Sequence, residues 1–391
     1  MKIIARVVVH SVKNCAADLS SMAVVGASGR GQIARARMIV QTEDAASGAG
    51  TIPRDVLSRV GLVAIGRNEA ARLEACLTCR PAGLRGIVYV DSGSHDDSVK
   101  IAHAAGVEVV TLSGDRPFTA ARARNAGVLR LLELHPDIDK VQFIDGDCML
   151  ADNWLELAAS TLDRHPELVA VTGALHELHP DRTVYNRLCQ LEWDRVPPGF
   201  VASFGGIVMI RVDSLAKVGG WNPAVIAAED DELAVRLRQL GGKIVRLEHS
   251  MAYHDAAITR FEQWWRRSVR TGHAYAQVAA LHGSGSEHYF VHERRRALLW
   301  GVVVPLAVLT GLLPTLGGSL WLLSVYPLQV VRLLARELGR GKSRRDAALL
   351  ALSSLVARFA EARGVFEYHV NHYKGKSPRI IEYKGLQHEP G

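Results

Sequence analysis

The chain has 391 residues, of which 48% are hydrophobic and 22% are charged. These proportions exclude a disordered or fibrous chain, and the length suits one large globular domain or two ordinary ones. Lys+Arg 47 against Asp+Glu 40 gives a formal net charge of +7, which favours anionic partners such as nucleotides, lipid headgroups or nucleic acid without choosing among them. Five scattered cysteines are too few for a disulfide framework and are typical of a reducing compartment.

The first 58 residues do not have the pattern of a domain. Small residues dominate, and the stretch EDAASGAGTIP has the composition of a linker. The segment Ala23–Ala36 imitates the glycine turn of a dinucleotide-binding fold, but no strand with an acidic ribose ligand follows it at the expected distance. We therefore predict a poorly structured N-terminal extension over residues 1–58, without a secretory signal.

From Val60 onward, short apolar runs alternate with helical stretches. The apolar runs are Val60–Ile65, Gly86–Val90, Val107–Leu112, Val141–Ile144 and Leu168–Thr172. The helical stretches between them include Asp97–Ala105, Phe118–Leu134 and Asn153–Arg164. Strands separated by helices predict an α/β fold with a mostly parallel sheet and helices on both faces. In such sheets ligands bind outside the carboxyl ends of the strands, so polar residues there form the candidate site.

Two apolar stretches follow Arg296, namely Ala297–Leu313 and Ser319–Leu334, with a Pro-Thr-Leu-Gly-Gly turn between them. They have the pattern of a membrane hairpin. Each is slightly shorter than the ~20 residues that a full span needs, so a re-entrant or interfacial helix pair is nearly as well supported as true spanning. Basic residues on both flanks place both ends on the cytoplasmic side. The alternative is a buried helical hairpin in a soluble subdomain.

The stretch Arg345–Arg363 has apolar residues at helical spacing and arginines on the other face. This pattern is compatible with a helix on a membrane surface and also with one packed on the main domain. We predict three regions: the extension over 1–58, an α/β domain over 59–290, and a membrane-associating helical hairpin with an amphipathic C-terminal segment over 291–391. This arrangement predicts a location on the cytoplasmic face of the inner or plasma membrane.

Acidic residues stand at or just after predicted strand ends. Asp91 ends IVYVDSGS, Asp145 and Asp147 end VQFIDGDCM, and Glu229 with Asp230 opens EDDELAVRLRQLG. Two carboxylates two residues apart on an extended segment suit a hard divalent cation that also bridges phosphate oxygens. The alternatives are an ordinary Asp-Gly turn for the first pair and a helix cap for the second.

An ordered series of motifs spans about Val60 to Gly272. It comprises AIGRNEAARL, IVYVDSGSHDDS, AARARNAG, FIDGDCML, GGIVMIRVDSLAKVGGWN and AAEDDELAVRLRQLGGKI, followed by a downstream histidine. Each motif is a weak signal, but their order and spacing together are specific. The series resembles the inverting nucleotide-sugar glycosyltransferases of family 2, which have a GT-A fold. The resemblance implies a nucleoside diphosphate sugar as donor and a divalent cation, Mn²⁺ or Mg²⁺, as cofactor.

The resemblance also implies roles for individual residues. The residues that would contact the donor or organise its loop are Ile65, Arg67, Glu69, Asp91, Arg124 and Asp145. Asp147 and His254 would ligate the metal, since imidazole beside carboxylate suits Mn²⁺ as well as Mg²⁺. Asp230 would be the general base, and like-charge repulsion from Glu229 would raise one of the two pKa values. Gly66-Arg67 departs from the family pattern, in which many members have Pro and Tyr before the following Asn.

Inverting transfer needs one carboxylate on the acceptor side, because the attacking hydroxyl must lose its proton. The apolar C-terminal stretches favour a lipid-linked or polysaccharide acceptor. Transfer to a polyprenyl phosphate is the enzymatic alternative, and a non-catalytic membrane scaffold that retains the fold is the other. The segment Phe261–Tyr275 is compatible with closing over a diphosphate, with packing at a membrane interface, or with core packing beneath a solvated arginine face. No nucleic-acid-binding motif accompanies it, so we expect no nucleic-acid partner.

Overall fold

The computed structural model describes residues 55–375 and residue 381. Most of the predicted N-terminal extension, residues 1–54, lies outside the described residues. Residues 55–58 form a turn, and the side chain of Leu57 is buried in the core of the sheet domain. The described fold therefore includes four residues that we assigned to the extension, namely residues 55–58.

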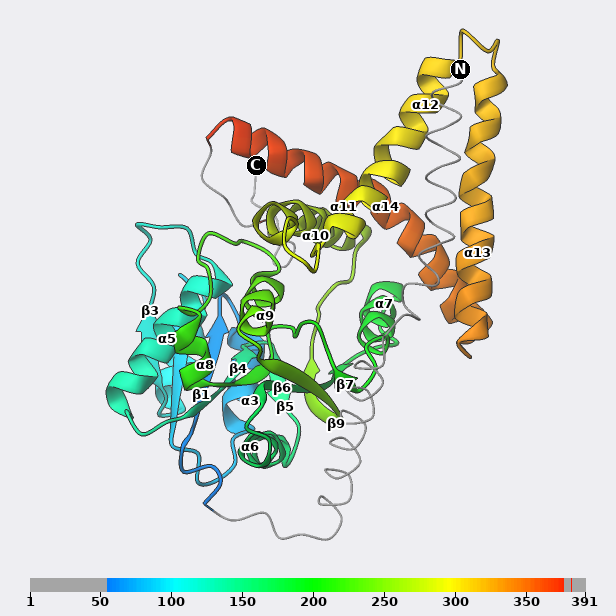
Figure 1. Cartoon of the computed structure of the whole chain (residues 1–391). Coiled ribbons are helices and arrows are strands. Elements are labelled where there is room, and N and C mark those ends of the chain that lie inside the picture. Colours follow the sequence, from blue (N-terminus) through cyan, green and yellow to red (C-terminus); the bar gives the residue numbers. More distant parts are fainter. Residues whose placement is uncertain (1–54, 376–380, 382–391) are drawn as a thin grey trace.

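A nine-stranded sheet organises the described part of the chain (Figure 1). In chain order its strands are β1 (Val60–Gly66), β2 (Gly86–Asp91), β3 (Glu108–Thr111), β4 (Lys140–Asp145), β5 (Cys148–Leu150), β6 (Leu168–Glu177), β7 (Gly199–Phe200), β8 (Val208–Arg211) and β9 (Lys243–His254). Their order across the sheet is β3-β2-β1-β4-β8-β6-β9-β5, and β7 pairs with β9.

The pairing differs between the two halves of the sheet. β3, β2, β1 and β4 pair in parallel, as the sequence predicts. Beyond β4, strand β8 runs antiparallel to both of its neighbours, and β5 and β7 run antiparallel to β9. The α/β fold with a mostly parallel sheet is confirmed, because β1, β2, β3, β4, β6 and β9 run in one direction and only the short strands β5, β7 and β8 run in the other. Strands β5, β7 and β8 have only two to four residues, and runs this short carry no periodic pattern that sequence could reveal.

Helices cover both faces of the sheet. They are α3 (Ala70–Thr78), α4 (Ser98–Ala104), α5 (Ala120–Leu134), α6 (Trp154–Arg164), α7 (Val184–Trp193), α8 (Val212–Lys217) and α9 (Glu229–Gln239). Alternate residues of β1 enter different cores: Leu62 packs with α3 and α6, and Val63 packs with α5 and α9. Because both faces of β1 are covered, its sequence is a continuous apolar run rather than an alternating one.

The chain after β9 is helical. Its elements are α10 (Phe261–His282), α11 (Val291–Leu298), η1 (Leu299–Val303), α12 (Val304–Gly311), η2 (Gly318–Ser324), α13 (Val325–Gly339) and α14 (Arg344–Tyr373). Helix α10 lies between α14 and the sheet domain (Figure 1). The two helices cross closely, because a Cβ added at Gly272 would overlap the backbone of Glu361, and one at Gly364 would overlap the backbone of Val269.

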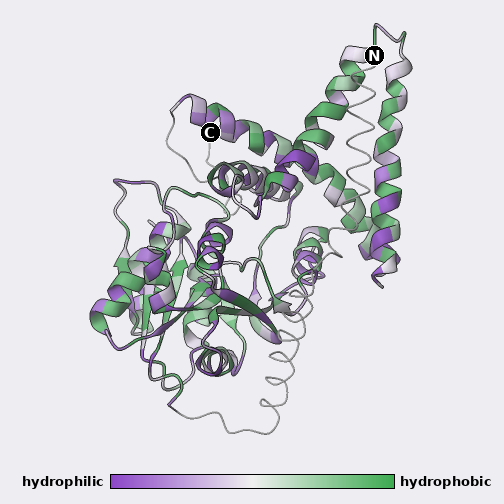
Figure 2. Ribbon diagram, viewed as in Figure 1, coloured by the Kyte–Doolittle hydropathy of each residue, from purple (hydrophilic) through white to green (hydrophobic). Residues whose placement is uncertain are grey.

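The two predicted apolar stretches form a helical hairpin that projects from the rest of the molecule (Figure 2). Within residues 55–375, the stretch Gly318–Gly339 is long and apolar enough to cross a membrane by length and composition, with a mean hydropathy of 1.3. Only 11% of the most apolar 18-residue segment within this stretch is buried. Leu313 and Leu316 near the turn are 86% and 97% exposed. The described part of the chain therefore does not bury the hairpin.

Candidate active site

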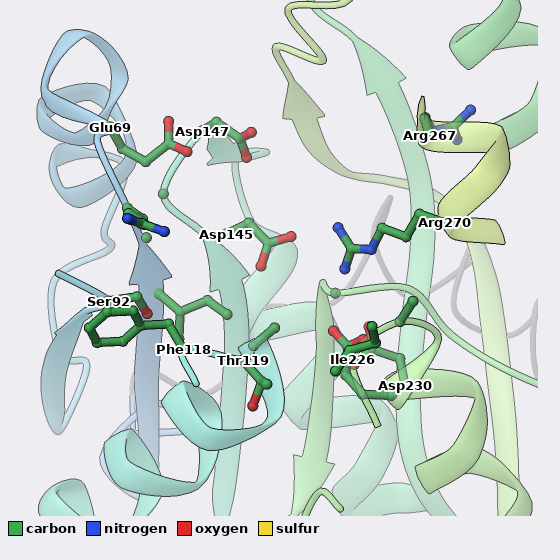
Figure 3. A pocket seen from close by; sticks show the side chains of 18 of the residues that line it. Glu69, Ser92, Phe118, Thr119, Asp145, Asp147, Ile226, Asp230, Arg267 and Arg270 are labelled. Atoms are coloured by element: carbon green, nitrogen blue, oxygen red, sulfur yellow. The ribbon is translucent and has the colours of Figure 1, made fainter. Parts of the chain in front are cut away.

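A large pocket opens at the carboxyl ends of β1 and β4 (Figure 3). Its volume is about 1660 Å³, well above the ~300–1,000 Å³ of an ordinary small-molecule site. One wall is made by strand ends and the loops that follow them, and the opposite wall is made by α10 and the segment before α9. The pocket therefore has room for two ligands between two different walls.

Eight of the ten residues predicted for the site line this pocket: Ile65, Arg67, Glu69, Arg124, Asp145, Asp147, Glu229 and Asp230. The ninth, His254, lies behind Asp147. The tenth, Asp91, is not brought to the pocket. Its carboxylate is 1% exposed and accepts hydrogen bonds from the backbone N–H groups of Gly93 and Ser94, at 3.0 and 2.9 Å. The structure thus uses Asp91 to form the turn after β2, and Ser92 lines the pocket beside it.

The predicted metal ligands come together through the pairing of β5 with β9. Cys148 is the register partner of His254, which places His254 beside the residue that precedes Cys148. Nε2 of His254 lies 3.2 Å from Oδ2 of Asp147. Ligand atoms of Asp147, Cys148 and His254 lie within 4.8 Å of one another. A carboxylate oxygen and an imidazole nitrogen in this arrangement fit Mn²⁺ or Mg²⁺, and the Cys148 thiol is a softer donor that neither ion requires.

Arg124 holds three of the site carboxylates. It projects from α5 and its side chain is 2% exposed. Its Nη1 group donates to Oε1 of Glu229 at 2.8 Å and lies 3.1 Å from Oδ1 of Asp230. Its Nη2 group donates to Oδ1 of Asp145 at 3.1 Å. A buried guanidinium is tolerated here because it is paired, and the resemblance's assignment of Arg124 to the nucleotide stays a prediction.

The pKa values of Glu229 and Asp230 are shifted in opposite directions. Burial raises the pKa of Asp230 to about 7, against the opposing charge of Arg124 and with support from the neighbouring Glu229. Burial also acts on Glu229, but the charges of Arg124 and Arg270 outweigh it and hold the pKa of Glu229 below its usual value. Asp230 also accepts a hydrogen bond from the indole N–H of Trp221 at 3.0 Å. A carboxylate that titrates near neutrality is suited to general-base work.

Glu229 and Asp230 do not occupy the N-cap position of α9, the position that the alternative interpretation expects. Glu229 and Asp230 lie in the first turn of α9, and the N-cap position is held by Ala228, which makes no side-chain cap hydrogen bond. Ala228 has a φ of 56°, a left-handed conformation that a residue with a side chain rarely adopts. This turn directs the two carboxylates towards Arg124, while the helix dipole still favours negative charge at this end.

The first wall of the pocket carries a flat cationic and aromatic surface. The guanidinium of Arg67 lies over the ring of Phe118, 5.6 Å from its centroid, and both residues line the pocket with Ile65. Stacked guanidinium and phenyl groups offer a planar surface to a planar ligand. Arg67 therefore has a defined partner here, although Gly66-Arg67 departs from the usual family sequence. Phe118 begins a predicted helical stretch, and a single aromatic residue there carries no sequence pattern that indicates a site.

Helix α10 supplies the second wall from one of its faces. Its pocket-lining residues recur every three or four positions: Arg260, Gln263, Arg267, Arg270, Thr271, Ala274 and Tyr275. Figure 3 shows the Arg270 guanidinium pointing across the pocket towards Asp145. Arg267 donates from Nη1 to Oε2 of Glu192 at 2.8 Å. Trp264 does not line the pocket and is buried among residues of α7 and α14, so the pocket-facing interpretation of Phe261–Tyr275 applies to the arginines and the core-packing interpretation to Trp264.

The chain matches known proteins at the family level. Residues 65–219 match the model of glycosyl transferase family 2, and residues 192–258 match a model described as the N-terminal domain of galactosyltransferase. The first match contains Asp145, Asp147 and Arg124, three of the residues gathered at the pocket. The chain therefore contains a glycosyl transferase family 2 domain, matched over residues 65–219, with the GT-A fold. The protein is a glycosyltransferase.

The fold is also similar to solved structures of low sequence identity. One is the mannosyltransferase PcManGT from Pyrobaculum calidifontis in complex with GDP-Man and Mn²⁺, at 18% identity, with 81% of this chain and 88% of that chain covered and a TM-score of 0.49. Another is S. aureus TarS 1-349 in complex with UDP, at 13% identity, 81% and 92% coverage and a TM-score of 0.46.

A third is glucosyl-3-phosphoglycerate synthase from Mycobacterium tuberculosis in complex with Mn²⁺, UDP and glucosyl-3-phosphoglycerate. It is 17% identical, with 63% of this chain and 85% of that chain covered and a TM-score of 0.43. No curated protein sequence matches the chain.

Proposed function

We propose that this glycosyltransferase moves a sugar from a nucleoside diphosphate donor onto a hydroxyl of a lipid-linked or polysaccharide acceptor and inverts the anomeric centre. The observation that carries the proposal is Asp230. Its carboxylate is buried at the pocket, is held by Trp221 and Arg124, and has a pKa raised to about 7 by burial. The expected metal ligands Asp147 and His254 lie on the other wall.

The two walls divide the chemistry. A divalent cation held by Asp147 and His254 would neutralise charge on the departing diphosphate. Asp230 takes the proton of the acceptor hydroxyl as the acceptor oxygen bonds to the anomeric carbon and the bond from that carbon to the diphosphate oxygen breaks. Arg124 holds Asp230 and Asp145 in place, so the base is oriented before the acceptor enters. Attack from the α10 side, opposite the leaving group, gives inversion.

The acceptor side favours a ligand that carries phosphate as well as a hydroxyl. Arg260, Arg267 and Arg270 lie along one face of α10, seven and then three residues apart. Guanidinium groups bind phosphate oxygens through paired N–H donors. A glycan attached to a lipid through phosphate offers both groups, and the exposed apolar hairpin that follows α11 fits a lipid.

Transfer to a polyprenyl phosphate is the second candidate function, and the same arginines favour it. A phosphate oxyanion needs no base, however, so this reaction leaves the raised pKa of Asp230 without a use. The Asp230→Asn variant distinguishes the two: it loses transfer to a hydroxyl but keeps transfer to a phosphate. A mild-acid-labile lipid product would favour the phosphate acceptor. A non-catalytic scaffold would not be expected to keep Asp147, Asp230 and His254 in this arrangement.

A location on the cytoplasmic face of the inner or plasma membrane is part of the proposal. It is supported by the basic residues on both flanks of the apolar hairpin, which favour a cytoplasmic position for both of its ends.

The decisive experiment is metal-dependent cleavage of a panel of UDP-, GDP- and dTDP-sugars by the purified full chain. We expect release of one nucleoside diphosphate with Mn²⁺ or Mg²⁺, loss of release with EDTA, and loss in Asp147→Asn. Asp152→Asn is the matched control, because this exposed aspartate lies five residues further along and outside the pocket. Failure to cleave any donor, even with membrane extract as a source of acceptor, would overturn the proposal in favour of the scaffold.

A further inference from the structure

The end of the helical hairpin is apolar on all sides. Its exposed side chains are Leu306, Leu309, Leu313, Leu316, Leu320 and Trp321, which we call the hairpin tip. No charged residue lies between Arg296 and Arg332 in the sequence. A protein partner covers one face of a helix pair, whereas a helix that is apolar all round is typical of a lipid environment. The composition of the hairpin tip therefore indicates lipid rather than a second protein surface.

The side-chain hydroxyl groups within the hairpin are satisfied internally. Between Arg296 and Arg332 the hydroxyl groups belong to Thr310, Thr315, Ser319, Ser324 and Tyr326. Each of them donates a hydrogen bond to a backbone carbonyl of the hairpin itself, at 2.6 to 2.8 Å. In water such hydroxyls need no internal partner, but in hydrocarbon an unpaired polar group is costly. This second observation, independent of exposure, also fits burial of the hairpin in lipid.

Arginines surround the base of the hairpin. The exposed ones are Arg295, Arg332, Arg336, Arg340, Arg344 and Arg345. Near the last five of these in sequence the acidic side chains are Glu337, which is buried and shared by Arg195, Arg336 and Arg340, and Asp346, which is buried and paired with Arg187. The exposed surface at this level is therefore strongly positive. Anionic headgroups attract such a basic cluster and hold it at the membrane surface.

Helix α14 extends the apolar surface away from the hairpin. Leu352, Val356 and Phe359 are exposed on it at spacings of four and three residues, which places them on one face, and the Arg363–Glu367 ion pair follows on the same face. The opposite face packs against α10 and α7. Phe359 also contacts Tyr326 of the hairpin, with ring centroids 5.8 Å apart. The apolar face of α14 thus meets the hairpin at Phe359 and Tyr326.

The length of the hairpin limits how deeply it can enter a membrane. The first arm advances 17 residues from Arg296 to Leu313, which gives a helix about 26 Å long at ~1.5 Å per residue. The hydrocarbon core of a bilayer is ~30 Å thick, so this arm is shorter than a full span. A hairpin that crossed would place its turn in water on the far side, yet Leu313 and Leu316 at the turn are its most exposed side chains. The turn is therefore built to remain in hydrocarbon.

We propose that the hairpin tip inserts part-way into a bilayer containing anionic lipid, while the six arginines contact headgroups and the apolar face of α14 lies on the surface. The protein would then bind one leaflet without crossing the membrane. This inference rests on the proposed function only in that a lipid-linked acceptor would lie at the same surface. Vesicle binding and sugar transfer can be measured separately, so failure of one does not imply failure of the other.

The test is flotation of the full chain with phosphatidylcholine vesicles that contain 0 or 30% phosphatidylglycerol. We expect binding to the anionic vesicles, and a loss of at least tenfold in Leu313→Glu/Leu316→Glu. Leu129→Glu is the matched control, because Leu129 is an exposed leucine on α5 in the sheet domain. Arg332→Gln/Arg345→Gln should reduce the preference for anionic vesicles.

Circular dichroism and the midpoint of urea unfolding serve as the folding controls for all four proteins. Equal flotation of wild type and the Leu313→Glu/Leu316→Glu variant would overturn the proposal. So would absence of flotation together with a dimer in solution that the same substitutions dissociate, because the tip would then be covered by a second copy of the chain.

The depth is tested with a fluorophore on Leu316→Cys, in a chain that also carries Cys15→Ser and Cys79→Ser. We expect quenching by lipids brominated along the acyl chain and no quenching by iodide, either outside the vesicle or trapped inside it. Quenching by trapped iodide alone would show that the turn reaches the far side, and would replace partial insertion by true spanning.

Discussion

The sheet domain and the hairpin place side chains in opposite ways. In the sheet domain Arg124, Glu229 and Asp230 are buried beneath the pocket, where ionised groups are costly. In the hairpin Leu316 and Trp321 are exposed, where large apolar groups are usually few. Each region departs from the ordinary distribution at the place where it would meet its ligand. The comparison teaches that buried charged side chains and exposed large apolar side chains both indicate a candidate functional surface.

The two departures have different costs. The buried charges are stable only as a set, because each carboxylate depends on the same guanidinium. The exposed leucines depend on no neighbour, so each can be replaced without loss of a partner. Substitutions should therefore have large effects in the first region and small effects in the second, and the predictions below test that difference.

The largest effect is expected at Asp230. Asp230→Asn keeps the size of the side chain and removes its basicity, so kcat for transfer to a hydroxyl acceptor should fall about 10²–10⁴-fold. Steady-state transfer kinetics measure it, with donor KM close to that of wild type. Asp213→Asn is the control, because Asp213 is exposed on α8 and pairs only with neighbours on that helix. A drop of less than threefold would show that Asp230 is not the base.

Arg124→Met should destabilise the fold. Removing one member of a buried ion cluster typically costs about 3–5 kcal/mol, since the remaining charges lose their partner. The free energy of unfolding in urea measures the change. Arg130→Met on the same helix is the control, because Arg130 pairs with Glu108 and Glu133 at the surface, where such pairs contribute about 0–1 kcal/mol. Equal losses in both variants would contradict the clustered-charge account.

The pH dependence of activity and of stability should have opposite signs. Burial raises the pKa of Asp230 to about 7, so activity rises with pH up to about 7 and then levels off. The unfolded chain loses this proton near pH 3.9. The ionised carboxylate therefore costs the folded state increasingly as pH rises from about 4 to about 7. Asp230→Asn should gain stability relative to wild type between pH 5 and pH 8, as measured by urea unfolding at both values. An unchanged difference would contradict the raised pKa.

Gly364→Ala tests the close contact between α14 and α10. An added methyl group would meet the backbone of Val269, and such overpacking typically costs about 1–3 kcal/mol. We also expect weaker acceptor binding, because α10 must shift to accommodate it. Gly339→Ala is the control with the opposite sign. Nothing lies within 4 Å of a Cβ there, and alanine in a helix should stabilise by about 0.5–1 kcal/mol. Differential scanning calorimetry distinguishes the two.

The smallest effect is expected at Leu316. Because its side chain is almost fully exposed, Leu316→Ser should change the free energy of unfolding in detergent-free buffer by less than about 0.5 kcal/mol. A matched change in the core, Leu73→Ser, should be far more destabilising, since Leu73 is fully buried in α3. A large loss in Leu316→Ser would mean that the tip is packed against protein.

The sheet and its acidic strand ends could be predicted from the sequence because the signals there are local. A strand covered on both faces is a continuous apolar run, and the residues that follow it lie at the pocket by chain connectivity alone. Asp145 and Asp147 were found in this way. The same rule selected Asp91, whose side chain turns back to the N–H groups of Gly93 and Ser94. A strand end gives the position of a residue but not the direction of its side chain.

The rest of the site depends on contacts between distant segments. His254 meets Asp147 only because β9 pairs with β5, and the resemblance supplied that residue where spacing could not. Trp221 ends one of the sequence motifs, but the sequence does not show that its indole reaches Asp230. Both faces of α10 carry arginines and large side chains, so no periodicity distinguishes the face that lines the pocket.

The close crossing of α10 and α14 has a mechanical consequence. At Gly272 and Gly364 the backbones of the two helices are in contact, with no side chain between them. We therefore expect a displacement of one helix to move the other with it. One side of this pair forms the acceptor wall, and the other carries the hairpin. If the pocket changes width during turnover, we therefore expect the loops at the strand ends to move while α10 and α14 stay in place.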